Sequence, residues 1–407
     1  MPELADAVLP LIRTRGDLYR WSAANAHGRD MHEAIDILES HLATADAADA
    51  YAVTHKALAS SLKVIARADD SSGIIGDACR RLLDLHPRLA AAASVPPAKL
   101  VKWMFAFQLD GDVDYFELDP VAYAPALGER GLKAYRERLE EVRTSIPAKS
   151  LDDWRDPHSH ERWVLEWNDR RLAVLDRDVE AIIRTHARDR RVAAWLEQTA
   201  EALAEIGEID LAIDWAKQAT DFDLGHQSVQ AARYWCKLLG EHRPTELIEA
   251  RRYVFDRWPN GETAANLYSA VGADWPSIEP DIMSKLATNP SGAVSFALHT
   301  LHDPQRAWDL AHELDVESDR LWMSVADAYE RIDWVATLPV HRRLIEAELQ
   351  DADARRYRSA AVRLAHLRKL ANGTEHAAGV DEFIADLRLV HKRRPRLKQE
   401  FDRVRLP

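Results

Sequence analysis

A short turn recurs along the second half of the chain at nearly constant spacing, and it limits the fold more than any other feature of the sequence. Successive turns are about 33, 32, 31 and 30 residues apart, a period typical of arrays of paired helices. A single pair would leave an apolar face in water, so neighbouring pairs must stack on one another. The turns are centred near Gly207, Gly240, Gly272, Asp303 and Asp333.

The segments that flank these turns have the pattern of amphipathic helices. Apolar residues in 192–206 recur at the three- and four-residue steps of one helix face. After the turn, Trp215 lies between Ala212 and Ala216, and small residues beside large ones let two helices pack closely. Asp303, followed by proline, has the pattern of a helix N-cap. The sequence predicts an all-α protein, a TPR-like solenoid of helical hairpins with a repeat of about 30–33 residues.

Composition agrees with this fold class and limits the cellular setting. The chain of 407 residues has 15 glycines, 47% hydrophobic and 30% charged residues, which is ordinary for a soluble protein. No apolar run has the length of a membrane-spanning helix, and the first residues lack a signal-peptide pattern. Cys79 and Cys236 are the two cysteines, too few for a disulfide framework or a cysteine-rich zinc site. We expect a cytoplasmic protein with no membrane partner and no cofactor.

Changes in composition suggest where the domains begin and end. Tryptophan, arginine and aspartate are frequent between residues 143 and 191, and Pro147 and Pro157 indicate a linker. We predict four segments: an N-terminal helical domain over 1–147, a linker with a connecting helix over 148–190, the TPR-like array over 191–350, and C-terminal helices with a basic ending over 351–407.

Several short motifs resemble those of one known group. They are DDSSG at 69–73, LGERGL at 127–132 with Tyr135-Arg136 after it, the array of hairpins, and the ending from 383 to 397. Together they resemble the long helical region that follows the zinc finger in bacterial SWIM-type zinc-finger proteins, and the resemblance covers most of the chain. It implies a helical fold and association with a nucleic-acid-processing partner. The finger itself needs a C-x-C pair followed by cysteine and histidine, which is absent here, so the resemblance transfers no metal ligand and no catalytic residue.

Motifs for covalent catalysis and phosphate binding are absent. The chain has no G-x-S-x-G, G-x-x-x-x-G-K or H-E-x-x-H pattern, and we expect no enzymatic activity. The stretch from His158 to Glu161 offers metal-ligand residue types, but a polar linker is the commoner interpretation because no further histidine lies near it. We therefore predict no metal site.

Two acidic stretches have a structural interpretation. The pair Asp69-Asp70 is predicted to cap the helix that follows it. The loop with Asp110, Asp112 and Asp114 lacks the continuation of a calcium-binding loop and is predicted to be a loop with a helix cap.

Charge is unevenly distributed along the chain. The formal net charge is −13, yet residues 388–407 contain eight basic and two acidic residues, or about +6, which leaves about −19 elsewhere. One interpretation of this ending is contact with nucleic-acid phosphates or an acidic partner. The other is solvation of a terminal helix with ion pairs to the acidic body. The residues concerned are Arg388, Lys392, Arg393, Arg394, Arg396 and Lys398.

The function predicted from these patterns is recognition rather than catalysis. Among 13 tryptophans, Trp195, Trp215, Trp308 and Trp334 occupy array positions and are most simply core, whereas tryptophans on a groove would anchor a partner. We predict a non-enzymatic scaffold that binds another protein or peptide on a helical-repeat groove. The alternative is a nucleic-acid-associated accessory protein, such as a helicase or repair partner, that uses the basic C-terminal hairpin. The partner and the oligomeric state stay open.

Overall fold

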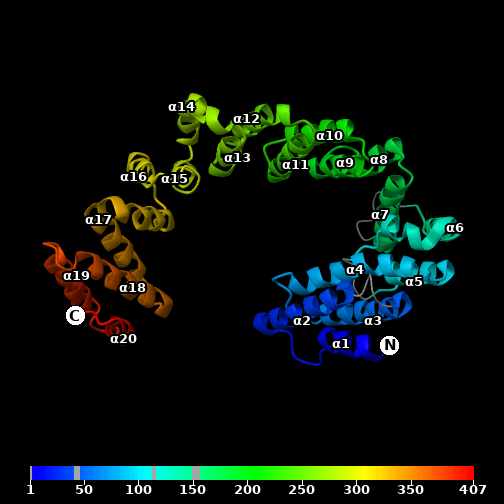
Figure 1. Cartoon of the computed structure of the whole chain (residues 1–407), viewed down its shortest axis with the longest axis horizontal. Helices are drawn as coiled ribbons and strands as arrows, with labels where there is room; N and C mark the ends of the chain where they lie inside the picture. The colour runs from blue at the N-terminus through cyan, green and yellow to red at the C-terminus, as the bar shows by residue number, and fades with distance from the viewer. Residues whose placement is uncertain (1, 41–45, 112–115, 149–155) are drawn as a thin grey trace. The chain divides into compact units, whose positions relative to one another are not determined.

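The computed structural model describes residues 2–40, 46–111, 116–148 and 156–407, and these ranges are helical, with no strand (Figure 1). The all-α prediction is confirmed. The helices are α1 (Pro2–Ile12), α2 (Trp21–Ser40), α3 (Ala47–Ile65), α4 (Ile74–Ala92), α5 (Pro97–Leu109), α6 (Pro120–Ser145), α7 (Ser159–Leu175), α8 (Val179–Ala187), α9 (Ala193–Glu205), α10 (Ile209–Asp221), α11 (His226–His242), α12 (Leu247–Arg257), α13 (Gly261–Val271), α14 (Trp275–Leu286), α15 (Pro290–His299), α16 (Pro304–Glu313), α17 (Asp319–Gln350), α18 (Ala354–Ala371), α19 (Ala377–Val390) and α20 (Pro395–Arg403), with 3₁₀ turns at Pro244–Glu246 and Gly272–Asp274.

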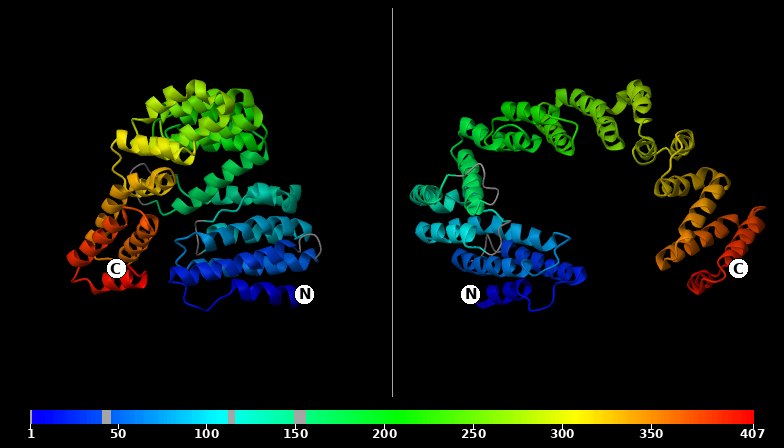
Figure 2. Two further views of the ribbon diagram at one scale, coloured as in Figure 1. Left: turned by 60° about the vertical axis from the view of Figure 1, so that its left-hand side comes forward. Right: turned by 180° about the vertical axis from the view of Figure 1, so that it is seen from behind.

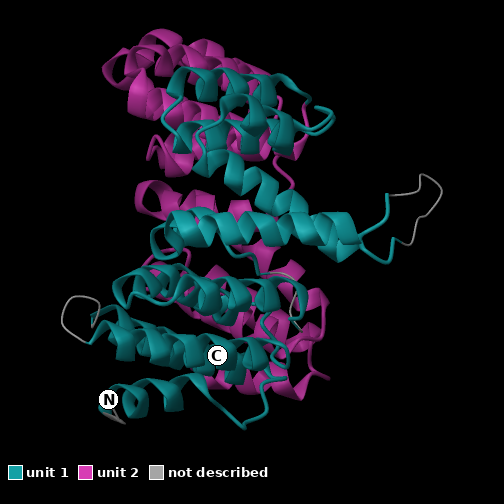
Figure 3. Cartoon of the chain, turned by 90° about the vertical axis from the view of Figure 1, so that its right-hand side faces the viewer, with its two compact units in different colours: residues 1–223 teal, residues 224–407 magenta. Residues whose placement is uncertain are grey.

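The chain divides into two compact units, coloured separately in Figure 3. Unit 1 is residues 1–223 and unit 2 is residues 224–407. Within each unit, helices that are close in sequence pack against one another: α3 on α4 and α9 on α10 in unit 1, α12 on α13 and α15 on α16 in unit 2 (Figure 2). This local packing is the arrangement expected of helical-hairpin repeats.

Two of the predicted glycine turns are confirmed. Gly207 joins α9 to α10 with φ of +85°, and Gly272 follows α13 with φ of +60°. Glycine adopts such positive φ values without the strain that a Cβ atom would cause. The turn placed near Gly240 was wrong by a few residues, because Gly240 lies inside α11. The chain turns instead at Pro244, whose missing N–H favours the start of a new helical segment.

The two predicted aspartate turns are also confirmed. Asp303 caps α16 by accepting a hydrogen bond at 2.9 Å from the backbone N–H of Arg306. Asp333 has φ of −148° and ψ of 91° inside α17, which breaks that helix into two arms. Its carboxylate accepts from the N–H of Ala336 at 3.0 Å and so begins the second arm.

An apolar core in unit 1 extends from α1 to α7. A polar network lies inside it: Tyr135 donates to Oδ1 of Asn168 at 2.6 Å, and the amide of Asn168 donates to Oε1 of Gln108 at 2.9 Å. Nε2 of Gln108 donates to the Tyr135 hydroxyl at 3.0 Å, and all three side chains are buried. The network satisfies these groups with one another, which is what their burial requires.

This network spans the predicted domain boundary near residue 147. Tyr135 in α6 and Asn168 in α7 share it, and Arg143 forms an ion pair with Asp169 at 2.7 Å across the same point. The tryptophan-rich segment that begins at α7 is therefore part of unit 1, which continues to residue 223. Residues 149–155 of the predicted linker lie outside the described residues.

Unit 2 contains successive apolar clusters, each shared by neighbouring helices. One surrounds Phe255 and Phe296, the next surrounds Trp308 and Trp322, and a third surrounds Ile345 and residues of α18 to α20. A series of small cores is typical of repeat architectures, because each pair of helices buries its apolar face only against its neighbours. Among the described helices, none combines the length and the apolar composition needed to cross a membrane.

Candidate functional site

A pocket of about 600 Å³ in unit 1 brings together tryptophan, arginine and acidic side chains. We call it the α7–α9 pocket, after the helices that supply most of its wall. Trp163, Trp167, Arg170 and Arg171 lie on one face of α7 because they follow one another at steps of four, three and one residues. The other lining residues are Glu117, His186, Arg188, Trp195, Gln198, Glu201, Ala202 and Glu205.

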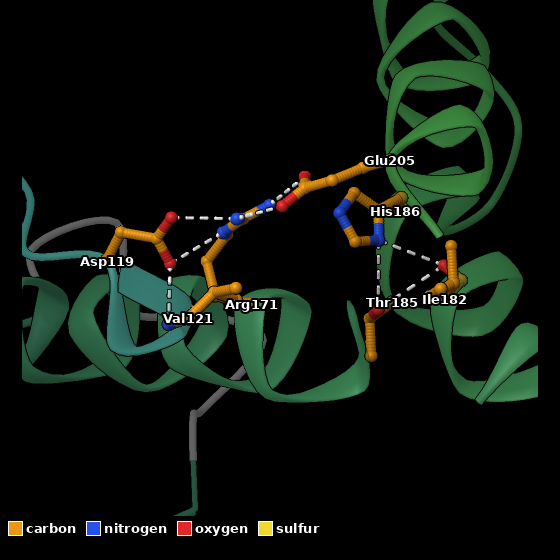
Figure 4. Close-up of polar contacts among 7 residues, drawn as sticks. All are labelled: Asp119, Val121, Arg171, Ile182, Thr185, His186 and Glu205. Carbon is orange, nitrogen blue, oxygen red and sulfur yellow. Dashed lines mark hydrogen bonds and ion pairs between the residues drawn. The ribbon is translucent and has the colours of Figure 1, made fainter. Parts of the chain in front are cut away.

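Arg171 connects one side of the pocket to the other (Figure 4). Its guanidinium donates to both carboxylate oxygens of Asp119, at 2.9 and 2.7 Å, and to both of Glu205, at 2.7 and 2.8 Å. Burial alone would lower the pKa of Arg171, but the hydrogen bonds to Glu205 and Asp119 raise it above its ordinary value. Asp119 also accepts from the N–H of Val121 at 2.9 Å and so caps α6. The arginine therefore holds α7 and α9 to the start of α6.

His186 forms a neutral part of the wall beside this arginine (Figure 4). Its Nδ1 donates to the carbonyl of Ile182 at 3.0 Å. Oγ1 of Thr185 lies 3.2 Å from the same nitrogen. Burial lowers the pKa of His186 to about 4, although the Ile182 contact opposes this shift. A histidine with this pKa is uncharged at neutral pH and lies far from the value that suits general acid–base catalysis there.

Two of the pocket's three tryptophans lie beneath arginines. The guanidinium carbon of Arg170 is 5.7 Å from the ring centre of Trp167, and that of Arg188 is 4.9 Å from the ring centre of Trp195. Such stacking holds a guanidinium flat while its N–H groups remain directed around its edge. Nε of Arg170 is buried and has no hydrogen-bond partner in the part of the chain that the structure describes. Burial also lowers the pKa of Arg170 from its ordinary value.

The chemistry available in the α7–α9 pocket is that of binding. Flat aromatic surface is combined with guanidinium N–H groups, which recognise carboxylates through paired hydrogen bonds. Trp195 was expected in the core, and its place in the wall of the pocket corrects that expectation. Trp215 and Trp308 are buried as predicted, and Trp334 packs against the last apolar cluster.

The basic residues of the C-terminal ending do not form one free surface. Arg388 pairs with Asp402 at 2.7 Å and donates to the carbonyls of Leu406 and Pro407. Arg394 donates to the carbonyl of Leu349, and Arg396 lies 3.7 Å from the carboxylate of Glu400. Half of the predicted contact residues thus stabilise the end of unit 2 itself. The exposed remainder is Lys392, Arg393 and Lys398.

The His158–Glu161 stretch forms the beginning of α7. Nδ1 of His158 lies 3.4 Å from the carboxylate of Glu161 one turn later. Nε2 of His160 donates to the carbonyl of Gln108 at 2.6 Å, so this nitrogen is already used in packing α7 against α5. The two histidines therefore do not converge on a common point with Glu161.

Two acidic stretches were predicted to cap helices, and the structure describes the first of them in full. Asp70 accepts hydrogen bonds from the N–H groups of Ile75 and Gly76, both at 2.9 Å, so the capping interpretation is confirmed for this residue. Asp110 ends α5, whereas Asp112 and Asp114 lie outside the described residues.

The α7–α9 pocket was not predicted from the sequence, although its tryptophans stand out there. The available signal was the face of α7 on which two tryptophans are followed by two arginines at helical spacing. The partners from α8 and α9 could not be identified, because they meet α7 only through tertiary packing of segments up to 34 residues away, as Arg171 does with Glu205.

Helical hairpins that stack on their neighbours, with a pocket lined by α7, α8 and α9, define an all-α protein of the helical-repeat class. Within that class, the chain belongs to the family of unknown function DUF6880, whose model matches residues 9–262. The matched range includes every residue that lines the α7–α9 pocket.

Comparison with other proteins adds little to this assignment. A search of curated proteins gave no match to the chain. Among solved structures, the chain is similar to one described as a "Circular tandem repeat protein with novel repeat topology and enhanced subunit contact surfaces". The sequences are 13% identical, the match covers 99% of this chain and 95% of that chain, and the TM-score is 0.17. At that TM-score the similarity supports no argument, and the fold assignment rests on the helices themselves.

Proposed function

We propose that this protein is a non-enzymatic scaffold that binds a segment of another protein in the α7–α9 pocket. The observation that carries the proposal is Nε of Arg170, buried above Trp167 with no hydrogen-bond partner among the described residues. Buried polar groups in folded proteins are nearly always hydrogen-bonded, and a buried donor without a hydrogen bond costs about 1–3 kcal/mol of stability. A ligand that offers an acceptor would remove that cost once the guanidinium turns toward the pocket, because Nε has almost no exposed surface as it stands.

The lining indicates the chemistry of the bound segment. Arg170 and Arg188 favour a carboxylate, and the indoles of Trp163 and Trp195 favour an apolar side chain next to it. The acidic residues Glu117 and Glu201 at the rim disfavour a segment with several negative charges. The partner we propose therefore presents one acidic residue beside an aromatic or aliphatic anchor.

Replacing Arg170 with methionine should weaken binding of such a segment by about tenfold or more, since it removes the guanidinium donor but retains the stem that covers Trp167. The segment is first selected by presenting a peptide display library to the purified full chain. Affinity is then measured for the selected peptides by fluorescence polarisation with wild type and Arg170→Met.

Arg191 provides a matched control, because its side chain is 82% exposed and lies outside the pocket. Arg191→Met should bind the selected peptides as wild type does. Selection that yields no shared acidic-plus-apolar pattern, or peptides that bind Arg170→Met with wild-type affinity, would rule out this function for the pocket.

A second candidate function is contact with nucleic acid through the C-terminal ending. It is favoured by Lys392, Arg393 and Lys398, which are exposed and form no ion pair among the described residues. Binding of a duplex or single-stranded oligonucleotide should then weaken steeply with salt, and should be lost when all three are changed to glutamine. Arg388→Gln is unsuitable as a test, because Arg388 holds the end of the chain. Oligonucleotide binding unchanged in the triple variant would contradict this second function.

Several expectations from the sequence belong to this proposal. We place the protein in the cytoplasm, where its free cysteines Cys79 and Cys236, both buried, would remain reduced. Its partner is another protein or peptide, with nucleic acid as the alternative. The resemblance to the helical region of bacterial SWIM-type zinc-finger proteins stays a prediction beside the DUF6880 assignment.

A further inference from the structure

In unit 2, α18 packs against α17 (Figure 1). A second concentration of polar side chains lies where these two helices meet. Asp327 and Glu330 are one turn apart on the first arm of α17, and the break at Asp333 brings His341 on the second arm back toward them. α18 contributes His366 from the other side. We call Asp327, Glu330, His341 and His366 the α17–α18 cluster.

The carboxylate of Glu330 is at the centre of this cluster. Its Oε1 lies 2.9 Å from Nε2 of His341, and its Oε2 lies 2.8 Å from Nε2 of His366. One ligand atom from each of Asp327, Glu330 and His341 lies within 4.8 Å of the others. Donor atoms around a transition-metal ion at about 2.1 Å are separated by roughly 3 to 4 Å, so small side-chain rotations would place these atoms in one coordination sphere.

The cluster contains buried polar atoms that lack a well-aligned hydrogen bond among the described residues. The side chain of His341 is 0% exposed and that of Glu330 is 11% exposed. Although Nε2 of His341 and Oε1 of Glu330 are close, they are not aligned for a hydrogen bond, and neither has another partner within the described residues. Native proteins rarely leave such atoms unpaired, and binding of an ion is one way in which such atoms are satisfied.

We propose that the α17–α18 cluster binds a divalent cation of the zinc or manganese type. Imidazole nitrogens combined with carboxylate oxygens form a set that suits zinc, manganese, iron or cobalt, whereas magnesium and calcium prefer oxygen ligands alone. This assignment departs from the sequence analysis, which predicted no metal site. It is independent of the peptide-binding function proposed for unit 1.

The guanidinium of Arg363 supplies a positive charge beside this cluster. Nη1 of Arg363 lies 3.2 Å from Nδ1 of His341 and 3.3 Å from Oδ1 of Asp327. A guanidinium only donates hydrogen bonds, so Nδ1 of His341 accepts here and the neutral ring carries its proton on Nε2. Metal binding through Nε2 requires transfer of that proton to solvent or to Nδ1, together with withdrawal of Arg363.

The structure has room for this withdrawal. Arg363, Asp327 and Glu330 line a pocket of about 780 Å³, which also contains His366. Nε of Arg363 is buried without a hydrogen-bond partner in the described part of the chain, so the contacts that withdrawal must break are those of Nη1 with His341 and Asp327. The pocket would also leave coordination positions of the ion open to water or to an anionic ligand.

The local sequence contained a weak signal for this site. Asp327 and Glu330 have the i, i+3 spacing that places two carboxylates on one helix face. His341 and His366 lie 11 and 36 residues from Glu330, and their approach depends on the break at Asp333 and on the packing of α18 against α17. Neither the break nor this packing can be predicted from a ligand motif of fixed spacing.

The test is zinc and manganese binding by the full chain without a histidine tag, measured by calorimetry and by competition with a chromophoric chelator. Wild type should bind about one equivalent of zinc. Asp327→Asn and His366→Gln should each weaken zinc affinity by roughly 10- to 100-fold or more. Losses of that size are typical when residues that only support the metal ligands are replaced. These two side chains are 56% and 47% exposed, so the variants should remain folded, which thermal unfolding checks.

Matched controls exist in the same unit. Asp319, on the same helix, has the same 56% exposure as Asp327, and His376 is 37% exposed beside Glu375. Asp319→Asn and His376→Gln should bind zinc as wild type does. Arg363→Gln should bind zinc at least as tightly as wild type, because it removes a competing cation. Absence of stoichiometric binding, or equal losses in the ligand variants and the controls, would overturn the proposal.

Discussion

Lowering the pH from 6.5 to 4 should destabilise unit 1 by about 3 kcal/mol through His86, and His86→Gln should remove most of this loss. His86 is 0% exposed in α4, and burial lowers its pKa from 6.5 to about 3, with a smaller contribution from His55. Each unit of this difference is worth about 1.4 kcal/mol. The effect is large because the buried imidazole, once protonated, has no exposed surface through which water could solvate its charge.

The sign follows from proton binding. The folded-state pKa lies below that of the unfolded chain, so the unfolded chain binds more protons between pH 6.5 and 3. The contribution of His86 to stability is fully present above pH 6.5 and is lost as the pH falls toward 3. Burial also lowers the pKa values of His55 and His186, which adds to the same trend.

Glutamine is the appropriate replacement because His86 has polar neighbours on both sides. Its Nε2 lies 3.0 Å from Nδ1 of His55, and its Nδ1 lies 2.9 Å from the hydroxyl of Tyr123. An amide can both donate and accept, yet it does not titrate in this range. Hydrogen exchange of α4 peptides, measured between pH 7 and 4 with correction for the intrinsic exchange rate, reports the stability of unit 1 separately from unit 2.

The control is His158→Gln, a histidine of unit 1 with a side chain that is 35% exposed. This variant should follow the wild-type dependence on pH. If wild type and His86→Gln lost the same stability between pH 6.5 and 4, the acid sensitivity of unit 1 would have another source.

The sequence predicted local features of this fold better than distant ones, for physical reasons. The turns at Gly207, Gly272 and Asp303 were found because a positive φ or a capping carboxylate acts within a few residues. The turn near Gly240 was misplaced because glycine was taken as the stop signal, whereas the proline four residues later ends the helical path.

The candidate sites depend on contacts that have no local signal. Trp195 has the spacing of a core residue, and its role in a pocket wall follows from how α9 packs beside α7. Glu330 meets His366 across 36 residues of chain. The contacts of Arg388 and Arg394 likewise have no local signal, because the carbonyl groups to which they donate come near them only in the folded chain.

Replacing Asn168 with leucine should destabilise unit 1 by about 3 kcal/mol, the second large effect we expect. Asn168 is 0% exposed and is the acceptor for the Tyr135 hydroxyl at 2.6 Å and the donor to Gln108 at 2.9 Å. Leucine has a similar shape but removes both hydrogen bonds, and it leaves the Tyr135 hydroxyl proton and Oε1 of Gln108 with only a long contact, 3.4 Å between the two oxygens. Each buried unsatisfied group costs about 1–3 kcal/mol. Hydrogen exchange of α5, α6 and α7 peptides at pH 7 measures the loss.

A double-mutant cycle separates the network from simple loss of packing. Tyr135→Phe removes the hydroxyl that Asn168 accepts from, so combining it with Asn168→Leu removes two partners together instead of stranding one. The combined variant should therefore cost about 1 kcal/mol less than the sum of the two single variants. Strict additivity, or a loss below about 0.5 kcal/mol for Asn168→Leu, would contradict the role of the network.

The same substitution should also reach the α7–α9 pocket. Asn168 follows Trp167 directly and precedes Arg170 by two residues on α7, but its side chain is directed into the core. The Asn168 side chain fixes α7 against α5 and α6. It therefore also fixes the position of the α7 face that carries Trp163 and Arg170. A peptide selected on the wild-type pocket should thus bind the Asn168→Leu variant more weakly, even under conditions in which unit 1 remains folded. If the variant bound the peptide with wild-type affinity, the ion pairs of Arg171 with Asp119 and Glu205 would be sufficient to position the pocket.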